Sequence, residues 1–318
     1  MRSTPPGRRA ALAVPAPPIS CPAPAPAPCK TPDSASALPR NPGTPLDLAR
    51  VRSTRVNQPA VARRVAALNA SRSVKKDHQA AWLVRAIQCM DLTTLSGDDT
   101  PGRVHRLVAK ARQPVREDLL AALGLPTLQV GAVCVYHDRL RDNQLSVAAG
   151  STEIDIVISR RHALLHDWQA LYDEVRAFRA ACGDAHMKAI LATGELQTLE
   201  NVARASWVSM MAGADFIKTS TGKEAVNATL DVSLVLVRAI RESHEATGHG
   251  VGYKPAGGIS TARASTQYLT LMKEELGLRW MQPDLFRFGA SSLLTDVERQ
   301  LEHHVTGQYS ASWRHAMP

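Results

Sequence analysis

Two lysines stand at the ends of two short apolar segments, where an ammonium group is costly to bury. Lys218 ends the segment 215–218, and Lys254 ends the segment 251–254. We expect these segments to be neighbouring parallel strands about 4.8 Å apart, so that both lysines enter one pocket. Like charges in a dry pocket lower each other's proton affinity, and burial acts in the same direction. The pattern indicates an amine that is neutral at about pH 7 and can attack a carbonyl to form a Schiff base.

A carboxylate in a third apolar segment could move protons for such a reaction. Asp155 lies between Ile154 and Ile156, and a carboxylate beside an adduct can relay protons to and from it. A structural alternative stays open, because a lysine at a strand end often reaches solvent along its own stem or pairs with a carboxylate. Asp155 could be that structural partner in the same geometry.

Two loops rich in glycine and serine follow the last two predicted strands. They span 257–261 and 289–292, and a helical pattern follows each. In parallel α/β barrels, the loops after the last strands often hold a phosphate on backbone N–H groups at a helix N-terminus. A Gly-Gly pair alone is more often a simple turn, so a phosphate site and a turn are both open at this point.

A folded scaffold must position these residues. The chain has 318 residues, 44% of them hydrophobic, and is large enough to bury a hydrophobic core. Seven apolar segments are predicted to be strands: 90–95, 130–136, 154–158, 189–193, 216–219, 251–254 and 285–288. The clearest helical patterns are 60–70, 75–89, 164–182, 199–212, 226–246, 262–276 and 293–304. Alternating strands and helices are typical of parallel βαβ units. We therefore predict an α/β fold with seven strands, one fewer than an eightfold barrel has.

The first 45 residues differ in composition from the rest, because 13 of the 20 prolines lie there. We predict a disordered Pro/Ala/Arg-rich arm over 1–45, N-terminal helices over 46–89 and the barrel over 90–318. The arginines of this acid-free start leave a targeting segment open, although its prolines disfavour the amphipathic helix that such segments need.

The net charge of +9 belongs to the N-terminal part of the chain. Residues 1–75 hold 12 of the 38 basic and two of the 29 acidic residues, which leaves a body of 26 bases and 27 acids. We therefore expect no nucleic-acid partner.

No apolar run is long enough to cross a membrane, and five scattered cysteines without a C-x-x-C pair indicate a reducing, cytoplasmic setting. No metal-ligand spacing and no nucleotide-binding motif is present, so we expect no metal or other cofactor.

Several motifs taken together resemble those of deoxyribose-phosphate aldolases, above all the animal form. The matching segments are 90–95, 98–100, 153–157, 191–196, 214–223, 252–258 and 287–294. The resemblance runs from about Leu46 to the C-terminus. It implies a TIM-type (β/α)8 barrel that cleaves 2-deoxy-D-ribose 5-phosphate to D-glyceraldehyde 3-phosphate and acetaldehyde, in the breakdown of deoxyribonucleotides and without a metal.

The resemblance also implies a role for individual residues. Lys218 would be the Schiff-base nucleophile, Lys254 the second lysine that lowers its proton affinity, and Asp155 the proton relay. The implied substrate-binding residues are Asp91 and Thr93 near the sugar hydroxyls, and Gly222, Gly257, Gly258, Ser291 and Ser292 around the phosphate. The expected partner is a small phosphorylated sugar, and a homo-oligomer is left open.

The chain departs from the family pattern in two places. Only 16 residues, 137–152, separate Tyr136 from Glu153, where the family has a helix, a strand and a second helix. Sixteen residues can carry one crossover helix but not that unit. The barrel should therefore lack about one helix–strand unit and have either a gap with two exposed strand edges or a strained ring of seven strands. Ser260 stands where the family commonly has an arginine, which removes one charge-assisted phosphate contact worth roughly 1.5–3 kcal/mol.

Two alternatives to this aldolase remain open from the sequence. The missing unit should damage the pocket more than the remote faces, so an impaired or inactive aldolase-like protein could act by binding. The fold also does not fix the selectivity of the pocket, so a Schiff-base aldolase for another phosphorylated sugar is the second alternative.

Overall fold

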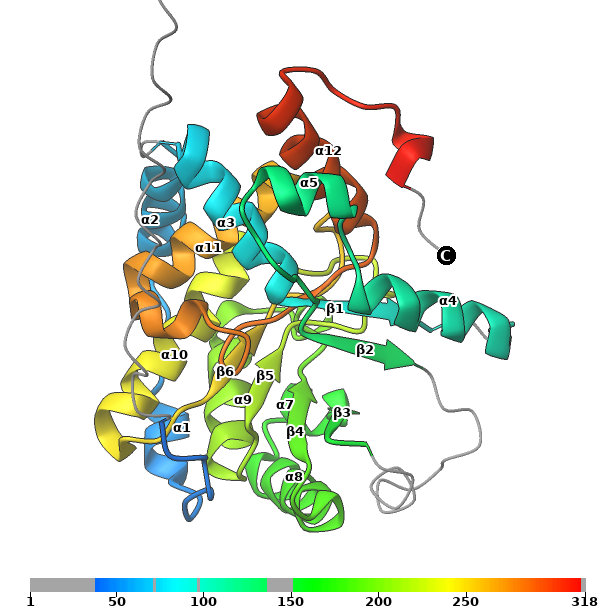
Figure 1. The fold of residues 1–318 in the computed structure, drawn as a ribbon. Coiled ribbons are helices and arrows are strands. Elements are labelled where there is room, and N and C mark those ends of the chain that lie inside the picture. The colour runs from blue at the N-terminus through cyan, green and yellow to red at the C-terminus, as the bar shows by residue number, and fades with distance from the viewer. Residues whose placement is uncertain (1–37, 71–72, 96–97, 136–150, 316–318) are drawn as a thin grey trace, which may run out of the picture. The chain divides into compact units, whose positions relative to one another are not determined.

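The computed structural model describes residues 38–70, 73–95, 98–135 and 151–315 (Figure 1). Its strands are β1 (Met90–Thr94), β2 (Ala132–Val135), β3 (Glu153–Val157), β4 (His186–Ile190), β5 (Phe216–Lys218), β6 (Gly252–Lys254) and β7 (Phe288–Gly289). Its helices are α1 (Leu48–Ser53), α2 (Gln58–Ala70), α3 (Lys76–Gln88), α4 (Pro101–Arg112), α5 (Glu117–Ala122), α7 (Arg160–Leu164), α8 (Trp168–Cys182), α9 (Leu199–Met211), α10 (Leu230–Thr247), α11 (Ala262–Leu276) and α12 (Ser292–Thr306). Three short 3-10 helices complete the description: η1 (Thr193–Glu195), η2 (Leu278–Met281) and η3 (Ser312–His315).

The strands form two parallel ladders, β2-β1-β7 and β3-β4-β5-β6. Two parallel bridges, Tyr253 with Phe286 and Ala256 with Gly289, connect the β6 region to the β7 region. The strand order is therefore β2-β1-β7-β6-β5-β4-β3, which is the cyclic order of an α/β barrel of the TIM type. This confirms the predicted fold class.

One junction of the ring differs from the others. Among the described residues, no ladder joins β2 to β3. These are the two strands that flank the segment 137–152, where the sequence predicts a missing helix–strand unit. Residues 136–150 lie outside the described part of the chain. Val135 on β2 and Val157 on β3 are both exposed, as expected for strands at an edge.

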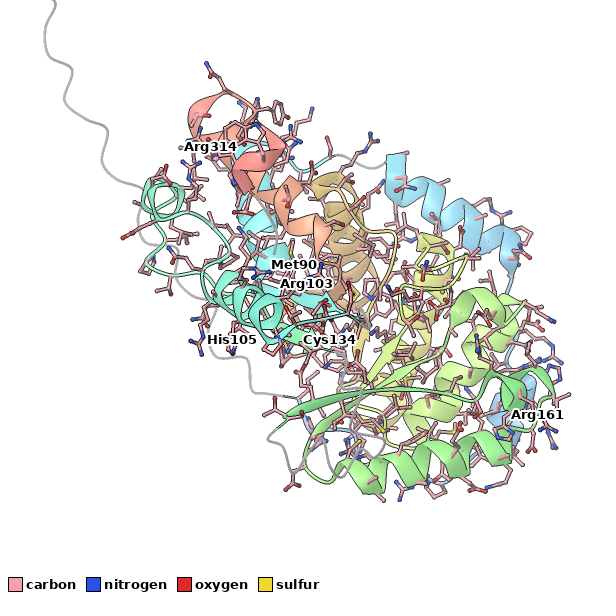
Figure 2. All side chains as sticks on the ribbon, turned by 90° about the vertical axis from the view of Figure 1, so that its right-hand side faces the viewer. Met90, Arg103, His105, Cys134, Arg161 and Arg314 are labelled. Carbon is pink, nitrogen blue, oxygen red and sulfur yellow. The ribbon has the colours of Figure 1, made fainter. Side chains whose placement is uncertain are left out.

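Helices cover the outside of the strands because each presents one apolar face. Helix α10 buries Leu234, Val237 and Ile240, which recur every three residues along one helix face. Helices α8, α9, α10, α11 and α12 pack on one another in succession, and α3 packs on α11 and α12 (Figure 1). Helix α4 lies beside β1 and β2; Figure 2 shows Arg103 and His105 on this helix and Cys134 on β2. No helix in the described ranges has the length and apolar character needed to cross a bilayer.

The helix predicted over 164–182 is wrong in its first part. The structure has two helices there, α7 and α8, with a break between them. His166 adopts a left-handed backbone conformation with φ 57°, which interrupts a helix. The Asp167 side chain then accepts the N–H of Ala170 and caps the start of α8.

Other boundaries shift for similar local reasons. The helix predicted from residue 226 begins at Leu230, because the Thr229 hydroxyl caps it by accepting the N–H of Val232. The strand predicted over 189–193 starts earlier, at His186, and ends at Ile190. The last strand, predicted over 285–288, is short and lies at Phe288–Gly289.

Residues 38–45, the end of the predicted arm, lie against the barrel. The Arg40 guanidinium binds the buried Asp215 carboxylate at 2.7 Å, and Arg40 also forms a parallel bridge with Gly250. The Asn41 amide donates hydrogen bonds to the carbonyls of Met210 and Ala214. The first 37 residues lie outside the described part of the chain, and their character as a disordered arm stays a prediction.

Candidate active site

The three residues expected to carry the chemistry meet in the interior of the barrel. The Lys218 ammonium lies 2.7 Å from Asp155 Oδ2, and the Lys254 ammonium lies 3.1 Å from the same oxygen. The register of the ladder explains this, because Lys218 and Lys254 are direct partners on β5 and β6. Both lysines are almost fully buried, with 3% and 1% of their surface exposed. The structural alternative is thus realised as well, since both lysines pair with a carboxylate.

A third buried lysine, Lys188 on β4, belongs to the same group of charges. Its ammonium lies 2.5 Å from Glu153 and 3.5 Å from Asp155. The register again places it, because Lys188 pairs with Asp155 across the β3–β4 ladder. Lys188 was not among the predicted site residues, because the predicted strand began one residue after it. Its sequence context, a lysine between Met187 and Ala189 near the start of a buried strand, could have indicated it.

Asp91 and Arg287 extend these contacts to β1 and β7. Asp91 is buried and binds Lys254 at 2.5 Å through Oδ2, while its other oxygen, Oδ1, accepts a hydrogen bond from Arg287 at 2.7 Å. Arg287, which comes directly before β7, also binds Glu153 at 2.8 Å. Asp91 therefore supports Lys254, and a contact with a sugar hydroxyl stays a prediction.

We call this group of seven side chains the interior cluster. Its members are Lys188, Lys218, Lys254, Arg287, Asp91, Glu153 and Asp155. Four are cations and three are anions, so one positive charge is in excess when all are ionised. Loss of one proton from a lysine would make the cluster neutral. A buried site with this balance favours one free amine, or an added anion such as a phosphate.

The electrostatics of the interior cluster assign Lys254 the role of a fixed cation. Burial would lower the pKa of Lys254, but the charges of Asp91 and Asp155 outweigh this effect and raise the pKa above its usual value. Burial would raise the pKa of Asp155, but Lys254 and Lys218 outweigh it and lower that pKa. In the same way, Lys254 and Arg287 overcome burial and lower the pKa of Asp91. Both carboxylates are therefore ionised, and Lys254 is protonated, at neutral pH.

The three lysines differ in how many carboxylates hold them. Lys254 contacts Asp91 and Asp155, and Lys188 contacts Glu153 and Asp155. Among the described residues, Lys218 contacts one carboxylate, Asp155. Lys218 therefore has the fewest carboxylate contacts of the three lysines in the described part of the interior cluster.

The expected phosphate loops after β5 and β6 face each other. Gly222 has φ 90°, and a Cβ atom at this position would lie 3.8 Å from the Cα of Gly257. Gly257 has φ 81°, and a Cβ there would collide with Asn227, so this close approach needs glycine. Gly258 has φ 79° and open space beside it. Ser260 is exposed and is separated from Gly258 by the buried Ile259.

Thr93 and Ser291 join the end of β1 to the start of α12. The Thr93 N–H donates to Ser291 Oγ at 2.8 Å, and the Ser291 hydroxyl donates to the Thr93 carbonyl at 2.8 Å. Ser292, the first residue of α12, is exposed. These contacts position Ser291 and Thr93 relative to each other, and their contacts with substrate stay predictions. No group of three or more His, Cys, Asp or Glu side chains among the described residues is arranged to hold a metal ion.

The barrel and its buried lysine–carboxylate cluster define a class of protein, the α/β-barrel aldolases. Residues 138–294 match the DeoC/LacD family of aldolases. The bovine deoxyribose-phosphate aldolase is 51% identical to this chain over 305 residues, which cover 85% of this chain and 96% of that protein. The human deoxyribose-phosphate aldolase is 50% identical over 307 residues with the same coverage. The chain belongs to the deoxyribose-phosphate aldolase family.

Solved structures support the fold independently. A Coccidioides immitis protein superposes with a TM-score of 0.53 at 23% identity, over 77% of this chain and 98% of that one. A Toxoplasma gondii protein gives a TM-score of 0.59 at 20% identity, over 72% and 97% of the two chains.

The comparison with the bovine relative also bears on the length of this chain. The alignment runs over 305 residues but takes in 85% of the 318 residues here. It therefore contains positions for which this chain has no counterpart.

Proposed function

We propose that this chain is a class I aldolase that cleaves 2-deoxy-D-ribose 5-phosphate to D-glyceraldehyde 3-phosphate and acetaldehyde. Membership of the deoxyribose-phosphate aldolase family supports this substrate. The observation that carries the chemistry is the buried Lys218, which contacts one carboxylate, whereas the neighbouring Lys254 contacts two. Lys254 is the fixed cation of this pair, and we assign Lys218 as the nucleophile that forms the Schiff base.

In the first step, the neutral Lys218 amine attacks the C1 aldehyde of the open-chain sugar. Loss of water from the resulting carbinolamine gives an iminium ion, with its positive charge on the Lys218 nitrogen. Asp155 contacts both lysines and is ionised, so it can accept and return the protons of this step. The iminium places its positive charge beside the Asp155 carboxylate.

In the second step, the bond between C2 and C3 breaks. The C3 hydroxyl loses its proton and becomes the aldehyde of glyceraldehyde 3-phosphate, while the electron pair of the C2–C3 bond moves toward the iminium nitrogen. The product on Lys218 is an enamine, which takes a proton at C2. Water then releases acetaldehyde and restores the amine.

The substrate's phosphate would lie where the loops after β5, β6 and β7 meet. Gly222, Gly257 and Gly258 would bring backbone N–H groups close to it, with Ser291 and Ser292 at the start of α12. Ser260 adds no charge to this site, so we expect phosphate binding weaker than in a relative with an arginine there. We further propose a cytoplasmic enzyme, in keeping with its scattered cysteines.

The cleavage reaction tests this function directly. Full-length protein is incubated with 2-deoxy-D-ribose 5-phosphate, and glyceraldehyde 3-phosphate is followed through its reduction by a coupled, NADH-dependent assay. We expect turnover with this sugar and far less with D-ribose 5-phosphate, whose 2-hydroxyl is the matched difference. A folded, monodisperse preparation that turns over neither sugar would contradict the proposed function. Turnover of a different sugar phosphate alone would contradict the substrate assignment.

A further inference from the structure

A carboxylate of the chain itself fills the amide donors of the loop after β5. Glu224 accepts hydrogen bonds from three successive backbone N–H groups, those of Thr221 at 3.0 Å, Gly222 at 3.1 Å and Lys223 at 3.2 Å. The hydroxyl of Thr221 donates a fourth bond to the same carboxylate at 2.9 Å. Successive N–H groups that converge in this way form a concave site for an anion. The occupant of this site in the structure is Glu224.

This anion site lies at the meeting of the two glycine loops. Gly222, one of its donors, faces Gly257. The Ser220 hydroxyl contacts the carbonyl of Ala256 at 2.7 Å, which ties the loop after β5 to the loop after β6. The Asn227 amide donates a hydrogen bond to the Glu224 carbonyl at 2.8 Å, which stabilises the loop after β5. The N–H groups that Glu224 occupies are therefore among those closest to the expected phosphate.

Glu224 is an anion at neutral pH. Burial would raise the pKa of Glu224, but the N–H and hydroxyl donors of Thr221 outweigh this effect and lower the pKa. Glu224 itself is half-buried, whereas Gly222 and Lys223 are exposed. An incoming phosphate can thus reach the donors from solvent, but a carboxylate and a phosphate cannot use the same N–H groups at the same time.

We propose that Glu224 is an internal anion that occupies the amide donors of Thr221, Gly222 and Lys223 in the empty enzyme and yields them to the phosphate of the substrate. Glu224 then sets how strongly the enzyme prefers a phosphorylated sugar over an unphosphorylated one. Part of the binding energy of the phosphate is used to displace the carboxylate. This inference rests on the proposed function, because it takes the substrate to be a sugar phosphate.

The first test uses inorganic phosphate as the probe and needs no turnover. The dissociation constant of phosphate is measured by calorimetry on the full chain, on Glu224→Gln and on the control Glu245→Gln, which removes an exposed carboxylate of α10. A neutral amide accepts the same N–H groups more weakly than a carboxylate. We therefore expect phosphate to bind roughly three- to tenfold more tightly to Glu224→Gln and equally well to Glu245→Gln. Unchanged or weaker binding in Glu224→Gln would overturn the inference.

The second test compares two substrates. The ratio of kcat/KM for 2-deoxy-D-ribose 5-phosphate to kcat/KM for 2-deoxy-D-ribose should rise by the same factor in Glu224→Gln. If Glu224→Gln fails to fold, Glu224→Ala, which lacks any occupant for the donors, gives the same two measurements. Tighter phosphate binding without turnover of either sugar would contradict the proposed function but support the role of Glu224. Turnover with an unchanged ratio would overturn the role of Glu224 alone.

Discussion

At the scale of single residues, the proposed chemistry gives different roles to two neighbouring lysines. Lys254 is held as a cation by Asp91 and Asp155, and in the proposed mechanism Lys218 is the nucleophile beside it. Asp155 contacts the side-chain nitrogens of both Lys218 and Lys254, so it can accept a proton from either lysine or return one to it. Each of the three residues is therefore needed for a different reason.

Replacing Lys254 by Met should separate these roles. Without the fixed charge beside the proposed nucleophile, we expect the cleavage rate to fall at least about 100-fold. The remaining rate should rise as the pH increases, because a lysine attacks a carbonyl as its free amine. The measurement is the pH–rate profile of the cleavage reaction. Lys273→Met, which removes an exposed lysine of α11, is the matched control and should leave the profile unchanged.

Sequence patterns could predict Lys218, Lys254 and Asp155 because a charged residue in a buried strand is conspicuous. They could not predict which carboxylate pairs with which lysine, because that depends on the register between strands that are far apart in the sequence. Lys188 was missed because the strand start was placed one residue too late. Glu224 was missed because its role comes from a turn geometry that short polar sequences do not specify.

At the scale of elements, Arg287 connects three strands through the interior. It precedes β7, binds Asp91 on β1 and binds Glu153 on β3. Strand β3 lies at an edge of its ladder, so this contact and Lys188 are what hold its first residue from inside the barrel. The interior cluster is thus structural as well as chemical.

We expect Arg287→Met to destabilise the barrel strongly. Removing one partner of a buried ion pair leaves Asp91 and Glu153 undercompensated, at a cost of about 3–5 kcal/mol. The check is the free energy of unfolding in urea. Arg160→Met breaks an exposed pair with Glu195 and should cost less than about 1 kcal/mol. Equal effects of the two substitutions would contradict this role of Arg287.

Element types were predictable from periodicity, but their ends were not. The alternation of apolar strands and amphipathic helices predicted the correct fold class and the seven strands of the described residues. The break between α7 and α8 depends on one left-handed residue, His166, and on the cap by Asp167. The start of α10 depends on Thr229 in the same way. Such caps involve one or two hydrogen bonds and leave the hydrophobic pattern unchanged.

At the scale of the whole molecule, the interior cluster makes stability depend on pH. Asp91 and Asp155 have lowered pKa values in the folded state, so the folded protein holds these groups ionised more strongly than the unfolded chain does. Their contribution is fully present above the ordinary aspartate pKa and is lost as the pH falls toward their folded values. The raised pKa of Lys254 has the opposite sign, and its contribution is lost only at strongly alkaline pH.

Acid should therefore destabilise the protein progressively below about pH 5. Urea unfolding at pH 7, 5, 4 and 3 measures this effect. The free energy of unfolding should be nearly unchanged from pH 7 to pH 5 and should fall from pH 5 to pH 4 and again to pH 3, and the fall should be smaller in an Asp91→Asn variant, which lacks one of the two titrating groups. A free energy of unfolding that is constant from pH 5 to pH 3 would contradict the ionised interior cluster.

The short connection between β2 and β3 is the second property of the whole molecule. Within the described ranges, β2 and β3 each have one edge without a ladder partner, and such edges favour association with other chains. Replacing residues 137–152 by the corresponding bovine segment should raise the melting temperature and reduce aggregation, because the added unit covers both edges. Thermal unfolding and light scattering provide the measurement. A flexible Gly/Ser segment of the same length is the control, and an equal improvement with it would contradict the explanation.

The central claim, that Lys218 forms the Schiff base, has a direct chemical test. The full-length protein is treated with acetaldehyde and borohydride, digested, and searched for a lysine that has gained an ethyl group. We predict this modification on Lys218, at neutral pH, and its loss in Lys218→Ala. Modification of Lys188 or Lys254 in place of Lys218, or no modification in a sample shown to be folded, would contradict the account.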